Sequence, residues 1–333
     1  MTIHCPAFDL PDSELLSEGS ATILGAHRQR MKALMAQATQ PNPDTPSDPR
    51  EAERQQCYES EPYQQLIRDY PVNIDIEDRA GVPVEIFTPK KGIAPDNKKR
   101  LLINIHGGGF MGGSRTLSRL ESIPVAVLGN IKVISVDYRM APEHRHPAAR
   151  DDAFAVYQAC LKDYAPEQIG VFGSSAGAYT AAQLMVHLQE QGVALPAAVA
   201  MIAGGAFRKV GDSMVYGSAL VKAVTGYDLN SSKDAYFEGS DRNSPAVTPG
   251  LSDTLMAGFP PSFLAASTRD YLLSSVIATH RKLINLDVPA ELHLWDGLDH
   301  VFHCNMPKLT ESEELHQRTV AFFNRHLAAS SAP

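Results

Sequence analysis

The sequence is poor in cysteine and contains no C-x-x-C pair. Its four cysteines lie far apart, at Cys5, Cys57, Cys160 and Cys304. Protein metal centres and redox pairs need closely spaced thiols or a cluster of further ligands, and the spacing of cysteine and histidine offers neither. We therefore predict free thiols, no metal site and no cofactor.

The chain also lacks a long apolar run and a concentration of basic residues. No segment approaches the length that spans a bilayer, and Met1–Pro6 shows no basic patch followed by an apolar core, so we expect no signal peptide. With 38 acidic and 30 basic residues the net charge is −8, which disfavours nucleic acid and anionic membranes as partners. These absences predict a cytoplasmic protein that binds neither.

The informative segments are two glycine-rich stretches that each follow a strand-like run. His106–Phe110 reads His-Gly-Gly-Gly-Phe after Leu101–Ile105, and Gly173–Gly177 reads Gly-Ser-Ser-Ala-Gly after Ile169–Phe172. A G-x-S-x-G sequence on a strand-to-helix turn is the nucleophile elbow, and an HGGG loop earlier in the chain is the usual second half of its oxyanion hole. A lone G-x-S-x-G also occurs in turns without function, but the combination in this order indicates a serine hydrolase.

The elbow predicts Ser175 as the nucleophile. The turn is so tight that bulky neighbours would clash, and Gly173 and Gly177 meet this need. Ser175 would then lie at the carboxyl end of the sheet and at the amino end of the next helix. The partial positive charge of that helix end favours a developing anion.

A serine hydroxyl needs a base, and in this arrangement the partners follow in the order Ser, then Asp or Glu, then His. Asp270 follows the strand-like Phe263–Ala266, and His300 follows the strand-like Ala290–Trp295. We predict that His300 takes the proton of Ser175 and that Asp270 orients the imidazole.

Two neighbours compete for these roles. His303 is the alternative base, and Asp299 is the alternative acid. The carboxylate of Asp299 is poorly placed to reach the far side of the His300 ring, because the two residues are adjacent in sequence.

The HGGG loop must present backbone N–H groups close to the substrate oxygen, and consecutive glycines leave room for that approach. We predict that Gly108, Gly109 and Ala176 donate to the oxyanion and that His106 braces the loop. The residues predicted to contact the substrate are Phe110, Ser174, Met31, Leu34 and Phe207.

A competing interpretation is a dinucleotide site. Gly107–Gly112 also spells G-x-G-x-x-G after a strand, and Val133–Val136 ends before Asp137, where a ribose-binding acid would lie in an NAD-dependent oxidoreductase. That interpretation leaves Asp270 and His300 unexplained. It also requires a helix to begin at the glycines, where Gly113–Arg115 is typical of a continuing loop.

The motifs from about residue 100 onwards resemble the hormone-sensitive lipase family of α/β hydrolases, in particular its bacterial esterase branch. The segments that carry the resemblance are His106–Phe110, Asp137–His144, Pro147–Ala149, Gly173–Gly177, Asp270 and His300–Phe302. In this family an acid is more usual at the position of Ser174, a glycine at that of Ala178, and an acidic pair at that of Ser274 and Ser275. The segment Asp137–His144 is expected to buttress the oxyanion loop.

The resemblance implies an α/β-hydrolase fold with a mostly parallel central sheet, helices on both faces and a helical N-terminal cap. It implies a cofactor-free carboxylic ester hydrolase that forms an acyl-enzyme on Ser175 and accepts short to medium acyl chains. Ser267–Leu273 looks closest to members that act on acetyl esters or lactones. Some relatives are non-catalytic small-molecule receptors, which typically lose a triad member, and a homodimer is a common assembly for soluble enzymes.

Periodicity suggests how the chain is organised. Apolar residues at helical spacing predict a helix over 20–38, a second, more polar helical stretch covers about 50–69, and the Gly- and aromatic-rich stretch 205–255 would complete the cap. We therefore expect a cap at 1–70 and a catalytic domain at 71–333. Val72–Ile76 and Val84–Phe87 predict a hairpin, and Thr310–Glu313 predicts a capping box that opens the last helix.

Overall fold

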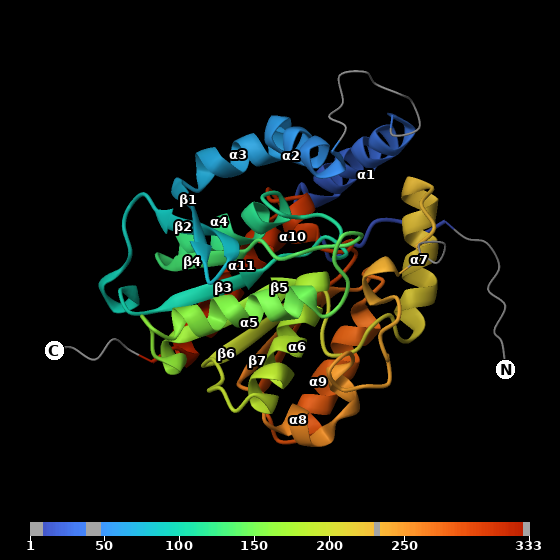
Figure 1. Cartoon of the computed structure of the whole chain (residues 1–333). Helices are drawn as coiled ribbons and strands as arrows, with labels where there is room; N and C mark the ends of the chain where they lie inside the picture. The colour runs from blue at the N-terminus through green and yellow to red at the C-terminus, as the bar shows by residue number, and fades with distance from the viewer. Residues whose placement is uncertain (1–8, 38–47, 230–233, 329–333) are drawn as a thin grey trace.

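The computed structural model describes residues 9–37, 48–229 and 234–328 (Figure 1). The strands are β1 (Val72–Arg79), β2 (Val82–Pro89), β3 (Leu101–Ile105), β4 (Lys132–Val136), β5 (Ile169–Ser174), β6 (Ala198–Ile202), β7 (Ser262–Ser267) and β8 (Ala290–Trp295). The helices are α1 (Ser20–Gln37), α2 (Pro49–Glu59), α3 (Glu61–Asp69), α4 (Leu117–Gly129), α5 (Ala148–Cys160), α6 (Ala176–Glu190), α7 (Asp212–Thr225), α8 (Asp253–Ala257), α9 (Leu273–Asn285), α10 (Phe302–Asn305) and α11 (Thr310–His326).

The strands form one sheet in the order β1-β2-β4-β3-β5-β6-β7-β8. β1 and β2 pair antiparallel as the predicted hairpin, β2 is antiparallel to β4, and the remaining neighbours are parallel. Parallel strands are buried on both faces, which is why β3 and β5 are largely apolar throughout. The predicted mostly parallel sheet is confirmed.

Alternate side chains of the strands face two separate cores, because successive residues of a strand point to opposite faces of the sheet. Ile103 and Val171 pack with residues of α5, α6 and α9 on one face. Leu102 and Phe172 pack with residues of α4 and α11, including Phe323, on the other. Helices therefore cover both faces, as Figure 1 also shows.

The N-terminal helices α1, α2 and α3 lie together along one side of the molecule, and α1 contacts α7, which follows β6 (Figure 1). α1 coincides with the predicted helix over 20–38. The helical stretch predicted over about 50–69 is confirmed as helical, but it is divided into two helices at Ser60. Ser60 ends α2 and its hydroxyl accepts from the backbone of Tyr63 at the start of α3, where Pro62 fits the first turn.

α11 begins at Thr310 as predicted, but the predicted capping box is wrong. Leu309 holds the N-cap position in an extended conformation and no side chain caps the helix there. The Glu311 carboxylate instead accepts hydrogen bonds from the Ser17 amide (2.7 Å) and the Ser20 hydroxyl (2.8 Å). These contacts join the start of α1 to the last helix.

Among the residues placed by the structure, no helix is both long enough and apolar enough to traverse a lipid bilayer.

Candidate active site

The turn between β5 and α6 holds Ser175 in a strained conformation. Its φ of 52° and ψ of −116° are unusual for a residue with a side chain. A Cβ on Gly177 would lie 1.7 Å from the carbonyl oxygen of Ile105, and one on Gly173 would lie 2.3 Å from the same atom. Both glycines are therefore needed for β3 to approach the elbow, as the sequence predicts.

Ser175, His300 and Asp270 meet at the carboxyl ends of β5, β7 and β8. The Nε2 atom of His300 lies 2.9 Å from the Ser175 hydroxyl, and its Nδ1 atom lies 2.8 Å from the Asp270 carboxylate. Asp270 is buried and also accepts from the backbone of Leu272 at 2.7 Å. The three predicted residues thus form a continuous chain of contacts from carboxylate to hydroxyl.

The two competing residues face elsewhere. Asp299 lies 4.0 Å from the guanidinium of Arg28, and burial raises the pKa of its carboxyl. His303 is fully buried and its ring packs edge-on against that of His316. Neither replaces Asp270 or His300 in the chain of contacts.

Two glycines of the loop after β3 have positive φ angles, a backbone conformation that glycine adopts readily. Gly108 has a φ of 116°, and a Cβ there would lie 2.1 Å from the Gly112 carbonyl oxygen. Gly109 has a φ of 62° and open space around it, so a side chain there would project into the space above the loop. Gly108, Gly109 and Ala176 all line the same pocket as Ser175.

Three side chains brace this loop from behind. The His106 ring stacks on Tyr138 at 4.2 Å, and its Nδ1 atom lies 2.6 Å from the Gly107 carbonyl oxygen, while burial lowers its pKa to about 4. The Tyr138 hydroxyl donates to the His106 carbonyl at 2.8 Å. Arg50 of α2 donates to the carbonyls of Met111 (3.0 Å) and Ala141 (2.7 Å). These contacts give His106 the bracing position that the sequence predicts.

Sequence reasoning missed a buried carboxylate behind the loop. Glu121 of α4 accepts hydrogen bonds from the Gly107 amide (3.0 Å), from the Asn104 side chain (2.8 Å) and from the Ser174 hydroxyl. Burial raises its pKa to about 7, and the three donors oppose that rise. The signal in the sequence was a pair of polar residues, Asn104 in an apolar strand and Glu121 in an apolar helix.

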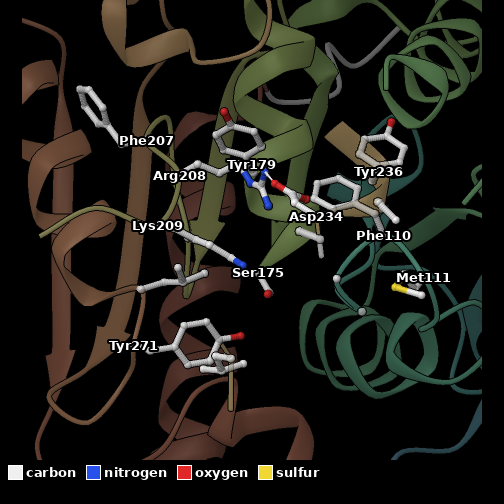
Figure 2. Close-up of a pocket in the computed structure, with 18 of the residues that line it drawn as sticks. Phe110, Met111, Ser175, Tyr179, Phe207, Arg208, Lys209, Asp234, Tyr236 and Tyr271 are labelled. Atoms are coloured by element: carbon white, nitrogen blue, oxygen red, sulfur yellow. Dashed lines mark hydrogen bonds and ion pairs between the residues drawn. The ribbon is translucent and has the colours of Figure 1, made fainter. Parts of the chain in front are cut away.

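The pocket in front of Ser175 has a volume of about 240 Å³ and is rich in aromatic side chains (Figure 2). Its aromatic lining residues are Phe110, Tyr179, Phe207, Tyr227, Tyr236 and Tyr271. The Phe110 ring stacks on Tyr236 at 4.3 Å, which fixes one wall. Tyr271 packs against the His300 ring at 4.2 Å. Burial raises the pKa of Tyr271, and a hydrogen bond with Ser175 opposes that rise.

Phe110 and Phe207 therefore lie where the prediction places them, and two other predicted contacts are wrong. Ser174 is buried and turned towards Glu121, because it is the last residue of β5 and points away from the pocket. Met31 is half-buried but lies outside the pocket lining. The side chain of Leu34 lies outside the described residues.

The dinucleotide interpretation does not fit this geometry. α4 begins at Leu117, beyond the glycines, so no helix starts at the G-x-G-x-x-G segment. The Asp137 carboxylate accepts from Ser114 (2.5 Å) and Arg115 (3.2 Å), so it is already paired. Within the described ranges, no three side chains of the metal-binding types come together.

Comparison with known families and proteins agrees with the geometry. Residues 102–304 match the model of a family with the alpha/beta hydrolase fold. The chain is 28% identical over 225 residues to an acetyl-hydrolase of Streptomyces hygroscopicus, a match that covers 67% of this chain and 75% of that protein. It is also 28% identical over 249 residues to an esterase of Acinetobacter venetianus, covering 70% and 77% of the two chains.

Solved structures give the same picture. The crystal structure of an esterase that is 30% identical matches with a TM-score of 0.81, over 98% of this chain and 99% of that chain. An esterase from the bacterial hormone-sensitive lipase family matches with a TM-score of 0.74 at 24% identity, over 91% and 99% of the two chains, and so supports the fold.

Proposed function

This chain belongs to the α/β-hydrolase family, and on that premise we propose that Ser175, His300 and Asp270 form its catalytic triad. The enzyme is a carboxylesterase, in agreement with the esterases that it resembles. The observation that carries the assignment is that one imidazole contacts both the serine hydroxyl and a buried carboxylate.

The geometry supports an acyl-enzyme mechanism. The Ser175 hydroxyl attacks the ester carbonyl while His300 Nε2 takes its proton, and His300 then returns that proton to the leaving alkoxide. A water molecule, activated by His300, releases the acid from Ser175. Asp270 keeps the Nδ1 proton in place and stabilises the imidazolium that forms in both steps.

We propose that the negative oxygen of the tetrahedral intermediate is bound by the amides of Gly108, Gly109 and Ala176. Ala176 is the first residue of α6, so its N–H group belongs to the positive end of that helix. Donors that are fixed before the reaction need no rearrangement when the charge develops. The contacts of His106, Tyr138 and Arg50 around the loop hold its amide donors in place.

The pocket favours short to medium acyl chains, because aromatic side chains enclose a small volume beside Ser175. Acetyl esters are the first candidates within this range, since one relative is an acetyl-hydrolase and others are acetyl esterases. A lactone would use the same residues, with the ring oxygen as leaving group.

Hydrolysis of p-nitrophenyl esters from acetate to dodecanoate, by wild type and Ser175→Ala in parallel, tests this proposal. We expect turnover to peak at short chains and kcat to fall by about 10⁶-fold in the variant, because triad residues act as a unit. Near-wild-type activity in a folded Ser175→Ala protein would overturn the mechanism, and a peak at dodecanoate would overturn the proposed pocket size.

We propose further that residues 1–70 and part of 205–255 form a cap on the catalytic domain at 71–333. Support comes from the packing of α1 on α7 and from Arg50, which reaches from α2 to the oxyanion loop. Phe207 and Tyr227 of the second segment line the pocket.

The assembly and the location of the protein stay predictions. A homodimer in the cytoplasm, with a small-molecule ester as substrate, is the proposal, and sedimentation together with cell fractionation tests it. The receptor interpretation is not favoured, since Ser175, Asp270 and His300 are all present and in contact.

A further inference from the structure

Among the described residues that line the pocket beside Ser175, positively charged side chains outnumber negatively charged ones by one. Its charged lining residues are Arg208, Lys209 and Asp234, and Asp234 is the only carboxylate among the described lining residues. Arg208 forms an ion pair with Asp234, and Arg242 approaches the same carboxylate at 3.1 Å. The negative charge of Asp234 is therefore already matched without Lys209.

Lys209 has no hydrogen bond or ion pair within the part of the chain that the structure describes. Its side chain is directed into the pocket, towards Ser175 (Figure 2). Its backbone has a φ of 39°, a left-handed conformation that is costly for a residue with a side chain. The loop between β6 and α7 thus holds in the pocket, at a cost in backbone strain, an ammonium group that pairs with none of the described residues.

The surroundings of this ammonium group favour an anion. Arg208 is its sequence neighbour, and partial burial and the Arg208 charge both lower the pKa of Lys209. The Arg208 guanidinium is itself held 4.2 Å above the Phe237 ring, so it cannot move away from Lys209 freely. Like charges kept together in a concave site favour an anionic ligand. The site is thus positively charged in a chain whose net charge is −8.

We propose that Lys209 binds a carboxylate carried by the ester substrate, so that the enzyme prefers anionic esters over neutral esters of the same length. The inference rests on the proposed function, because the carboxylate is bound while Ser175 attacks the ester bond of the same molecule. The carboxylate lies either on the acyl part or on the alcohol part of the substrate. Both sources present the same group to Lys209.

The test compares kcat/KM for matched esters in a pH-stat assay. Monomethyl adipate against methyl hexanoate places the charge on the acyl part, and 4-acetoxybutyrate against butyl acetate places it on the alcohol part. The variants are Lys209→Met, which removes the charge, and Lys209→Arg, which keeps it. Lys99→Met is the control, since Lys99 is exposed just before the amino end of β3, whereas Ser175 lies at the carboxyl end of the parallel neighbour β5.

We expect the anionic-to-neutral ratio of kcat/KM to fall about tenfold in Lys209→Met for one of the two pairs, as for a charge-assisted contact that is partly exposed. Lys209→Arg should keep most of the ratio, Lys99→Met all of it, and high salt should reduce it in the wild type. The pair that responds identifies the part of the substrate that carries the carboxylate.

An unchanged ratio in Lys209→Met for both pairs would overturn the inference, and so would an equal drop in Lys99→Met. Those results leave the proposed function intact as long as the neutral esters are hydrolysed by wild type and not by Ser175→Ala. Loss of the proposed function has a different signature, namely hydrolysis that survives Ser175→Ala.

Discussion

The carboxylate of Glu121 accepts a hydrogen bond from the hydroxyl of Ser174, the residue directly before the nucleophile. The same carboxylate accepts a hydrogen bond from the amide of Gly107, the residue directly before Gly108 of the oxyanion loop. One side chain of α4 therefore fixes the relative position of the elbow and the loop. Asn104, Gly107 and Ser174 all donate hydrogen bonds to Glu121. An ionised carboxylate, which only accepts, therefore provides an acceptor for every donor of this cluster.

Glu121→Gln should lower kcat about tenfold or more with little change in KM. An amide has only one acceptor oxygen, so its NH₂ group would face a donor, and small displacements of the oxyanion donors are costly to rate. Steady-state kinetics with a neutral ester checks this. Glu313→Gln, on the exposed side of α11, is the matched control, and an unchanged kcat in a folded Glu121→Gln protein would contradict the positioning role.

Asp270→Asn should reduce kcat by roughly 10⁴-fold, because the amide stabilises the wrong tautomer of His300. Asp299→Asn serves as the comparison, since Asp299 directly precedes His300 in sequence and its carboxylate lies 4.0 Å from the Arg28 guanidinium. We expect only a modest effect from it. The assignment of the acid fails if the two variants exchange these results in the ester assay.

Gly177→Ala should prevent correct folding of the elbow, because its Cβ would lie 1.7 Å from a backbone oxygen that cannot move independently. Gly192→Ala is the control. It has a φ of 64° with open space around it, so it costs only left-handed strain of about 1 kcal/mol. Thermal unfolding and expression of the soluble protein measure the difference. Equal stability of the two variants would show that β3 is farther from the elbow than we describe.

Stability should fall as the pH drops from about 6.5 towards 4, because His316 and His106 are buried and burial lowers the pKa of each to about 4. A depressed pKa in the folded state contributes stability above the unfolded pKa of about 6.5, and that contribution is lost as the pH falls through 4. Glu121 acts in the opposite sense, since its raised pKa favours folding at lower pH.

His316→Gln isolates one of these contributions. When the pH is lowered from about 7 to about 4.5, the free energy of unfolding should decrease in both proteins. The decrease should be smaller in His316→Gln than in wild type, by about 2 to 3 kcal/mol. Urea unfolding at the two pH values measures it, and His144→Gln, at an exposed position, should behave as wild type. An identical pH dependence in all three proteins would show that His316 does not titrate with unfolding.

The sequence predicted the parts of the site that obey local rules. Ser175 lies in a motif whose glycines are dictated by close backbone approach, and Asp270 and His300 each follow a strand, where parallel strands bring their ends together. The sheet followed from alternating strand and helix patterns. These features depend on neighbours in sequence, so they could be found without coordinates.

The errors concern contacts between distant segments. Ser174 was placed in the pocket, although the strand direction turns it towards Glu121. The side that Met31 of α1 presents depends on how α1 packs on the body, which helical periodicity does not determine. Thr310 fits a capping box by spacing, yet Glu311 beside it pairs with Ser17 and Ser20, almost the whole chain away.

The contacts of Arg50 limit how the N-terminal helices can be exchanged between related enzymes. Its guanidinium joins α2 to Met111 and Ala141, and it also pairs with Glu143 at 2.6 Å. An N-terminal segment transplanted from a relative would disturb the oxyanion loop unless it brought an equivalent anchor for these carbonyls. Exchange of the N-terminal helices would thus act on turnover through the loop, although none of their described residues lines the pocket.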